Sequence, residues 1–142
     1  NMKDISHLLS QCNELKTLPD LSKWNTSNIE QMGYTFVRCP KLISLPDISK
    51  WNMSKAVDIS FIFCGCKSLV SDISKWDTSN TENFVYIFRN CHSLCSLPDI
   101  YKWNISKIKS IGGIILNCFS LMNSEYLKEW IDKIRNTNNI NN

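Results

Sequence analysis

Cysteine and histidine are the residue types in this sequence that are best suited to nucleophilic catalysis or metal binding. The chain has seven cysteines but only two histidines, His7 and His92. Cys91 directly precedes His92, whereas a nucleophile and its base must face each other across a site. One residue separates Cys64 from Cys66, whereas structural zinc sites usually have two to four residues between paired cysteines. We therefore expect a protein that is not an enzyme, with no catalytic residue, no bound metal and no cofactor.

Most of the cysteines follow a period instead of forming a cluster. Five of them are 27, 27, 25 and 27 residues apart, and a leucine follows each one by three positions. Four tryptophans keep the same phase, and nearly identical stretches such as LPDISKWNMSK and LPDIYKWNISK surround them. The two series are Cys12, Cys39, Cys66, Cys91 and Cys118, and Trp24, Trp51, Trp76 and Trp103. The chain therefore contains at least four copies of one motif of roughly 27 residues, which predicts a stacked repeat protein.

Composition and charge narrow the functional classes further. With 142 residues, of which 43% are hydrophobic, the chain is long enough for one compact domain with its own core. A net charge of +3 predicts neither nucleic-acid binding nor attachment to a charged membrane surface. No stretch of about 18 apolar residues occurs, so we expect no transmembrane segment in this chain.

Each repeat divides into two halves with different patterns. In the half that ends in cysteine, Ile29, Met32 and Phe36 have the i, i+3, i+7 spacing of one helical face, after a segment rich in helix-capping residues. The other half, for example residues 42–51, contains Pro46 and few good helix formers, which favours an extended segment. One short strand and one short helix per repeat is the plan of a leucine-rich-repeat-like α/β solenoid.

The C-terminal segment departs from the repeat. Its apolar stripe, at i, i+3, i+4 and i+7, consists of Leu127, Trp130, Ile131 and Ile134. With Asn123 or Ser124 as candidate N-cap, this stripe predicts an amphipathic capping helix over residues 123–135, followed by an Asn-rich tail, 136–142, with little reason to fold. Residues 1–122 then form the solenoid of about 4.5 repeats, truncated at its N-terminus, where no cap is visible and upstream repeats or another domain are expected.

The repeat unit, which runs from W-N-T-S-N through the cysteine and leucine to L-P-D-I-S-K-W, resembles the BspA-type leucine-rich-repeat surface proteins. The most similar subgroup has repeats close to DISKWNTSNVTNMSYMFYGCSSL. The resemblance covers about residues 1–122, and the positions in register include Trp24, Cys39, Leu42, Pro46, Asp47 and Trp51. It implies a right-handed solenoid on a microbial cell surface or outside the cell, which acts in adhesion or partner binding and has no catalytic residues. The departures are Thr81, the loss of Leu-Pro before Asp72, and the Gly112-Gly113 pair.

Side chains that recur in every copy are expected to form columns through the stack. The tryptophans could bind glycans or peptides, but positions with the core period usually belong to the core, and the periodic cysteines are expected to be buried thiols. Four aspartates precede four lysines by three positions: Asp20, Asp47, Asp72 and Asp99, and Lys23, Lys50, Lys75 and Lys102. They could form an acidic row for calcium or a partner. We favour self-neutralising pairs, or aspartates that bond backbone amides in a turn.

Three copies contain the triplet Asn-x-Ser, at Asn25, Asn52 and Asn104, which is the acceptor pattern for N-glycosylation. The remaining copy has Asp77 at this place. Because Asn and Asp can both close a turn on their own backbone, turn formation explains all four copies and glycosylation only three.

The sequence thus predicts a non-catalytic scaffold for binding or adhesion, with a protein partner on a host or on a neighbouring chain and no nucleic acid. Partner-binding residues are expected where the copies differ, with three tyrosines as aromatic anchors. The candidates are Lys16, Thr17, Ile43, Ser44, Val70, Cys95 and Ser96, with Tyr34, Tyr86 and Tyr101. The alternatives are a structural or assembly component and an accessory module of a larger multidomain protein.

Overall fold

The computed structural model describes residues 2–42, 45–66, 72–97, 99–121 and 123–140. These residues contain one α-helix, α1 (Glu125–Asn138), one 3-10 turn, η1 (Ile100–Lys102), and no β-strand. The prediction of an α/β solenoid with a short strand and a short helix in each repeat is therefore wrong. In the described repeats, the chain runs through turns and isolated bridges instead.

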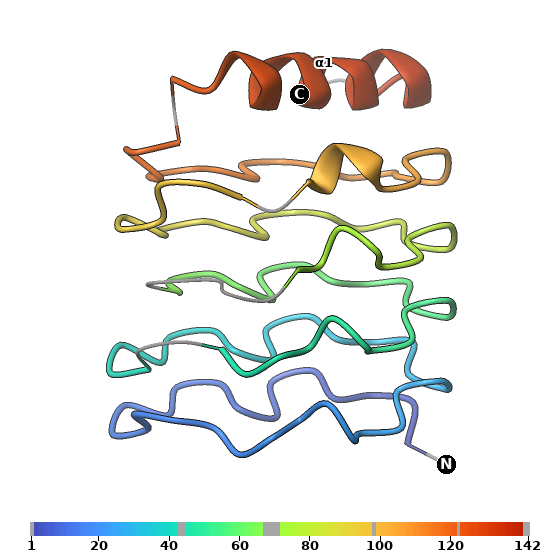
Figure 1. Ribbon diagram of the computed structural model, residues 1–142. Coiled ribbons are helices and arrows are strands. Elements are labelled where there is room, and N and C mark those ends of the chain that lie inside the picture. The colour runs from blue at the N-terminus through green and yellow to red at the C-terminus, as the bar shows by residue number, and fades with distance from the viewer. Residues whose placement is uncertain (1, 43–44, 67–71, 98, 122, 141–142) are drawn as a thin grey trace.

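The repeats lie on top of one another as successive rungs of chain, with α1 across the C-terminal end (Figure 1). Isolated parallel bridges connect the same position of consecutive rungs and give the register of the stack. The bridged residues are Asp4, Gln31, Asp58, Asn83 and Ser110. Each rung therefore lies directly against the next in sequence, one repeat further along the chain.

Backbone hydrogen bonds explain why no helix forms in the half-repeat that ends in cysteine. Alternate amides donate to the following rung, as from Ile5 to the carbonyl of Gln31 at 2.9 Å and from Gln11 to that of Val37 at 2.9 Å. The amides between them close tight turns within the rung, as from Leu8 to the carbonyl of Ile5 at 3.1 Å. Both kinds of bond satisfy the backbone without the i to i−4 ladder that a helix requires.

Positive φ angles interrupt each of these half-repeats and exclude a helix there. In the second rung Tyr34 has φ 63° and Arg38 has φ 56°, both in the left-handed region. The apolar spacing of Ile29, Met32 and Phe36 nevertheless places all three side chains in the core. The i, i+3, i+7 pattern reported burial correctly, but tight turns produce the same spacing as a helical face.

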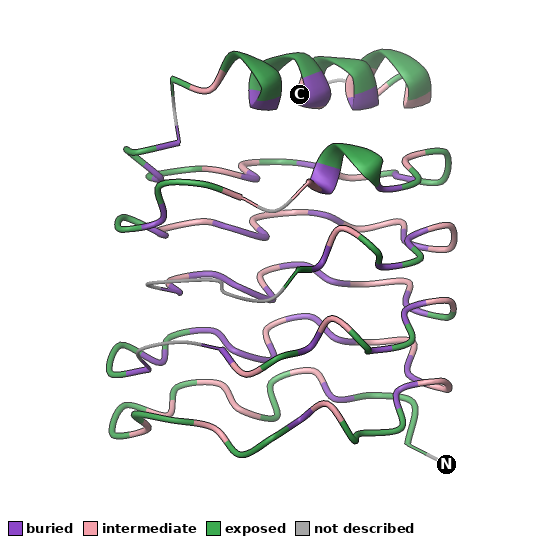
Figure 2. Ribbon diagram, in the orientation of Figure 1, coloured by how far each residue is buried: buried purple, intermediate pink, exposed green. Residues whose placement is uncertain are grey.

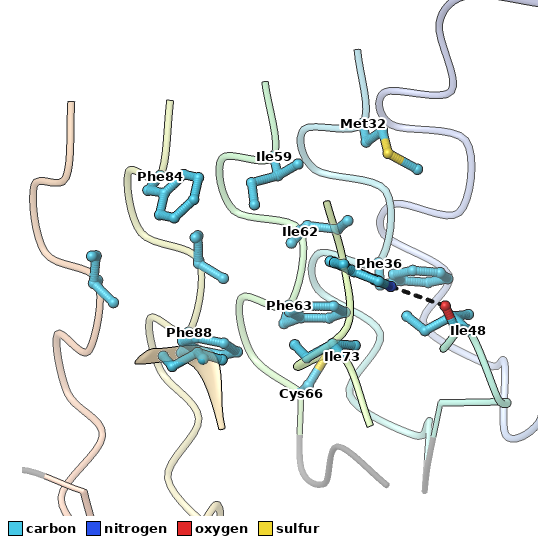
Figure 3. Close-up of a cluster of buried hydrophobic side chains, with 14 of the residues drawn as sticks. Met32, Phe36, Ile48, Ile59, Ile62, Phe63, Cys66, Ile73, Phe84 and Phe88 are labelled. Atoms are coloured by element: carbon cyan, nitrogen blue, oxygen red, sulfur yellow. Dashed lines mark hydrogen bonds between the residues drawn. The ribbon is translucent and has the colours of Figure 1, made fainter. Parts of the chain in front are cut away.

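Columns of like apolar side chains fill the interior of the stack (Figure 3). Phe63 stacks between Phe36 and Phe88, with ring centroids 6.4 and 5.7 Å apart and interplanar angles of 2° and 12°. A second column, buried to 3% exposure or less, consists of Ile5, Met32, Ile59, Phe84 and Ile111. No single rung could bury these side chains, so the core exists only between rungs.

Helix α1 covers the last rung with its apolar face. The Ser124 side chain accepts a hydrogen bond from the Leu127 amide, which confirms Ser124 as the N-cap. Figure 2 shows that the helix turns its buried residues toward the stack and its exposed residues away. The helix ends at Asn138, three residues beyond the predicted end, because Asn139 adopts the left-handed C-cap conformation with φ 53°. Residues 136–138, predicted to be part of an unfolded tail, are therefore helical.

Within the described ranges, no helix has the length and apolar character needed to cross a membrane.

Candidate functional site

Residues with positive φ angles form two columns along one side of the stack. We call the first the aromatic column; its members are His7, Tyr34, Phe61 and Tyr86, with Gly113 at the same place in the last rung. We call the second the polar column; it consists of Gln11, Arg38, Gly65, Asn90 and Asn117. In both columns, members of consecutive repeats are 27, 27, 25 and 27 residues apart.

Rings of the aromatic column stack directly on one another. The centroid of Tyr34 lies 4.6 Å from that of His7 and 4.3 Å from that of Phe61, with interplanar angles of 13° and 15°. Tyr86 continues the column at 4.8 Å from Phe61, tilted by 51°. The column ends at Gly113, because a Cβ atom there would overlap the Tyr86 ring. The glycine at position 113, which departs from the repeat pattern, is thus explained by the space that the Tyr86 ring occupies.

Gly65 leaves an open notch in the polar column. Apart from Gly65 and its two chain neighbours, no heavy atom of the described residues lies within 4 Å of the place where its Cβ would be. Its φ of 79° is one that glycine adopts without strain. Arg38 and Asn90 flank the notch from the neighbouring rungs, and Asn117 donates to the Asn90 side chain at 2.9 Å. Two cavities, of about 280 and 450 Å³, are both lined by Arg38, Gly65 and Asn90. We call these two neighbouring cavities together the Gly65 groove.

Two arginines at the Gly65 groove have no carboxylate partner among the residues that the structure describes. The Arg89 guanidinium packs over the Tyr86 ring, with Cζ 4.8 Å from the centroid, and its buried Nε–H has no acceptor among the described residues. Cys64 forms part of the lining beneath. Burial raises the pKa of the Cys64 thiol, while the positive charges of Arg89 and Arg38 oppose this rise. Both arginines are thus close enough to act electrostatically on one thiol.

The aspartates that recur from repeat to repeat accept hydrogen bonds that close turns. Asp20, Asp47 and Asp72 each accept a hydrogen bond from the amide of a serine two residues on, at 2.9, 2.9 and 3.0 Å. The bonds from these serines lower the pKa of the three carboxyls, which are exposed. Asp99 differs because Tyr101 replaces the serine, and its carboxylate accepts bonds from the hydroxyl of Tyr101 and the ammonium of Lys102.

The Asn-x-Ser triplets form the turns that the sequence predicted. Asn25, Asn52 and Asn104 accept hydrogen bonds from the amide and hydroxyl of the serine two residues on. Asp77 accepts the equivalent amide bond from Ser79 at 3.0 Å. Among the described residues, no group of three or more His, Cys, Asp or Glu is arranged to hold a metal ion.

Most members of the tryptophan and cysteine columns belong to the core. Trp51, Trp76 and Trp103 are buried, and each indole N–H donates to a carbonyl of the preceding rung, at 3.0, 3.1 and 2.8 Å. Trp24, in the first rung, is 37% exposed and stacks on Trp51. The cysteines show the same trend: Cys39, Cys66, Cys91 and Cys118 are buried, whereas Cys12 is half-buried. All seven cysteines of the chain are free thiols.

The predicted partner-binding residues that the structure describes lie in more than one place on the stack. Tyr34 and Tyr86 belong to the aromatic column. Cys95, Ser96 and Tyr101 meet in a different cavity, of about 430 Å³, beneath α1. Two further candidates, Lys16 and Thr17, are exposed, and three, Ile43, Ser44 and Val70, lie outside the described residues.

Arg38, Gly65 and Arg89, which line the cavity of about 280 Å³ in the Gly65 groove, were not among the residues predicted from the sequence. The sequence contains a signal for them, because the residues of the polar column differ from copy to copy, whereas the varied positions among the predicted residues lie in the extended half of the repeat. Trp130 was also missed as a member of the tryptophan series. It stands 27 residues after Trp103 and packs edge-on against it, with centroids 6.3 Å apart.

These features define a protein of stacked rungs, closed by a helix, with a polar groove on one side. Residues 1–130 match the family described as "Mycoplasma protein of unknown function, DUF285", and the chain belongs to this family. The family is found in BspA-like surface repeat proteins, which supports the resemblance at that level. Comparisons with curated proteins and with solved structures found no match.

Proposed function

We propose that this chain is a non-catalytic scaffold that binds a protein partner through the Gly65 groove. The observation that carries the proposal is the contrast between fixed and varied positions. Interior columns repeat similar apolar side chains in every rung, whereas the polar column changes from Gln11 to Arg38, Gly65 and Asn90. A scaffold that keeps its core and varies one exposed column presents a specific surface without needing catalytic chemistry.

The shape of the Gly65 groove supports recognition of an extended segment. The two cavities that meet at Gly65 reach from His7 in the first rung to His92 in the fourth. Aromatic edges line one part, and amide and guanidinium groups line the rest, which is the mixture of apolar and orienting polar groups that binding sites use. Stacked rings are already ordered, so a partner would order few side chains on binding.

A location on the cell surface or outside the cell completes the proposal. It is supported by the occurrence of the family in BspA-like surface repeat proteins. The subgroup with repeats close to DISKWNTSNVTNMSYMFYGCSSL is part of the proposal and rests on the sequence resemblance alone. Cells that produce the protein can be treated with a membrane-impermeant biotin reagent that labels exposed lysines. We expect labelling of intact cells; labelling only after lysis would contradict the surface location.

Binding itself can be tested with a displayed library of random peptides, selected in parallel on the native chain and on Gly65→Asn. Asparagine already adopts the left-handed conformation in this column, at Asn90 and Asn117, so this substitution fills the notch without demanding a new backbone. We expect a family of related peptides that bind the native chain and lose about tenfold or more in affinity on the variant. Absence of any enriched family, or equal binding to both proteins, would contradict the proposal.

A further inference from the structure

The lining of the Gly65 groove has one sign of charge. Two of the three arginines, Arg38 and Arg89, and both histidines, His7 and His92, line its two cavities. No Asp or Glu appears among the described residues of either lining. The chain as a whole has nearly balanced charges, with 16 basic and 13 acidic residues, so this segregation is not a consequence of composition.

Elsewhere in the stack, neighbouring rungs pair opposite charges at the same place in the repeat. Lys3 meets Glu30 at 2.7 Å, and Lys41 meets Glu14 at 2.6 Å. Lys109 meets Glu82 in the same way at 2.7 Å. The two groove arginines have no such partner among the described residues, although both line the cavity of about 280 Å³ at Gly65. Two unpaired guanidinium groups beside one hollow form a place where an incoming carboxylate would be bound by charge-assisted hydrogen bonds.

We propose that the Gly65 groove binds an acidic peptide segment of the protein partner, with a carboxylate seated between Arg38 and Arg89. This inference rests on the proposed protein-binding function and specifies the chemistry of the partner. The aromatic column contributes the wall, because stacked rings expose their edges, which carry the positive part of the ring quadrupole and suit an anion.

The same geometry disfavours a glycan as the occupant. Sugars stack on ring faces, but the faces of Tyr34 are covered by His7 on one side and Phe61 on the other. Sulfated polysaccharides are bound by dense clusters of lysine and arginine, whereas only two guanidinium groups stand at this groove. A peptide with spaced acidic side chains fits two arginines and the polar amides of Gln11 and Asn90.

The test uses a fluorescein-labelled peptide of five Glu-Ala repeats and an isosteric peptide of five Gln-Ala repeats, with binding followed by fluorescence anisotropy. We expect the full chain to bind the Glu peptide, to bind the Gln peptide at least about tenfold more weakly, and to release the Glu peptide as salt rises. The variant Arg38→Gln with Arg89→Gln should lose about tenfold or more. The matched control, Lys50→Gln with Lys75→Gln, removes the same charge from exposed sites outside the groove and should bind within about twofold of the native chain.

Folding of both double variants is checked by near-ultraviolet circular dichroism, which reports the stacked aromatic rings. Equal binding of the Glu and Gln peptides, or equal loss in both double variants, would overturn the proposal. A heparin-derived oligosaccharide that binds the native chain while the Glu peptide does not would overturn it in favour of a glycan. Library peptides without acidic residues that still depend on Gly65 would refute this inference and leave the proposed function intact, whereas absence of all peptide binding would refute both.

Discussion

Phe61 and Phe63 belong to the same rung, two residues apart, but lie in two regions with different roles. Phe63 is completely buried in the interior column, where similar rings from the rungs on both sides stack on it. Phe61 is half-buried in the aromatic column, with a positive φ of 55°, and forms part of the Gly65 groove. The difference indicates that the interior holds the rungs together, whereas the outer columns form the surface on which the proposed binding function depends.

The largest effect is expected from shortening an interior ring. Phe63→Ala removes a side chain that packs against Phe36, Phe88 and Trp76, and leaves a cavity between three rungs. We expect the free energy of unfolding to fall by about 3–5 kcal/mol, measured by denaturant titration. A loss below about 1 kcal/mol would show that the interior column is not the main source of stability.

The next largest loss of unfolding free energy is expected from replacing a buried tryptophan, and it should exceed the loss from replacing an exposed one. Trp103→Phe removes a buried indole that donates to the Ile73 carbonyl, and should cost about 1–3 kcal/mol. Trp24→Phe is the matched control, because Trp24 is 37% exposed, and should cost less than about 1 kcal/mol. Equal losses at both positions would contradict the contrast between buried and exposed members of this column.

Acid should weaken the turns that close the rungs. Bonds from serines hold the pKa of Asp20, Asp47 and Asp72 below that of the unfolded chain, near 3.9. Their contribution to stability is therefore complete above that pH and decreases as pH falls through the lower folded-state pKa values. We expect the unfolding midpoint to decrease below about pH 4.

Replacement of these three aspartates by asparagine keeps a turn-forming acceptor but removes the titration. The triple variant should therefore show a smaller decrease in the unfolding midpoint between pH 5 and pH 3 than the native chain. An identical acid profile in both proteins would mean that these turns do not couple to protonation.

The smallest change is expected in the aromatic column. Phe61→Gly loses stacking with Tyr34 but relieves the positive φ, and these two effects oppose each other. The free energy of unfolding should change by less than about 1 kcal/mol, in contrast to Phe63→Ala. A loss comparable to that of Phe63→Ala would remove the distinction between the two regions.

The sequence was sufficient to predict which side chains are buried, but not the backbone conformation of the repeats. The spacing of Ile29, Met32 and Phe36 identified core residues correctly, because any chain that returns in register every repeat buries the same positions. It did not distinguish a helix from a series of tight turns, since the deciding feature is the left-handed conformation of residues such as Tyr34 and Arg38. Non-glycine residues give little sign of that conformation in a sequence.

The groove was harder to predict than the core. The importance of Gly65 comes from the absence of a side chain between Arg38 and Asn90 on the neighbouring rungs, which is a property of the stack and not of local sequence. The C-terminal helix was the most predictable element, because its apolar stripe and its cap at Ser124 are local signals. Its contact with Trp103 through Trp130 could also have been inferred from the 27-residue step.

The central claim is that stability and recognition belong to separate regions, and one pair of variants tests it directly. We would measure the free energy of unfolding and the affinity for the Glu-Ala peptide in Phe63→Leu and in Arg38→Gln with Arg89→Gln. The account predicts that Phe63→Leu loses about 1–2 kcal/mol of stability with unchanged affinity. The arginine variant should lose about tenfold or more in affinity while its stability changes by less than about 0.5 kcal/mol. Parallel losses of stability and affinity in both proteins would contradict the account.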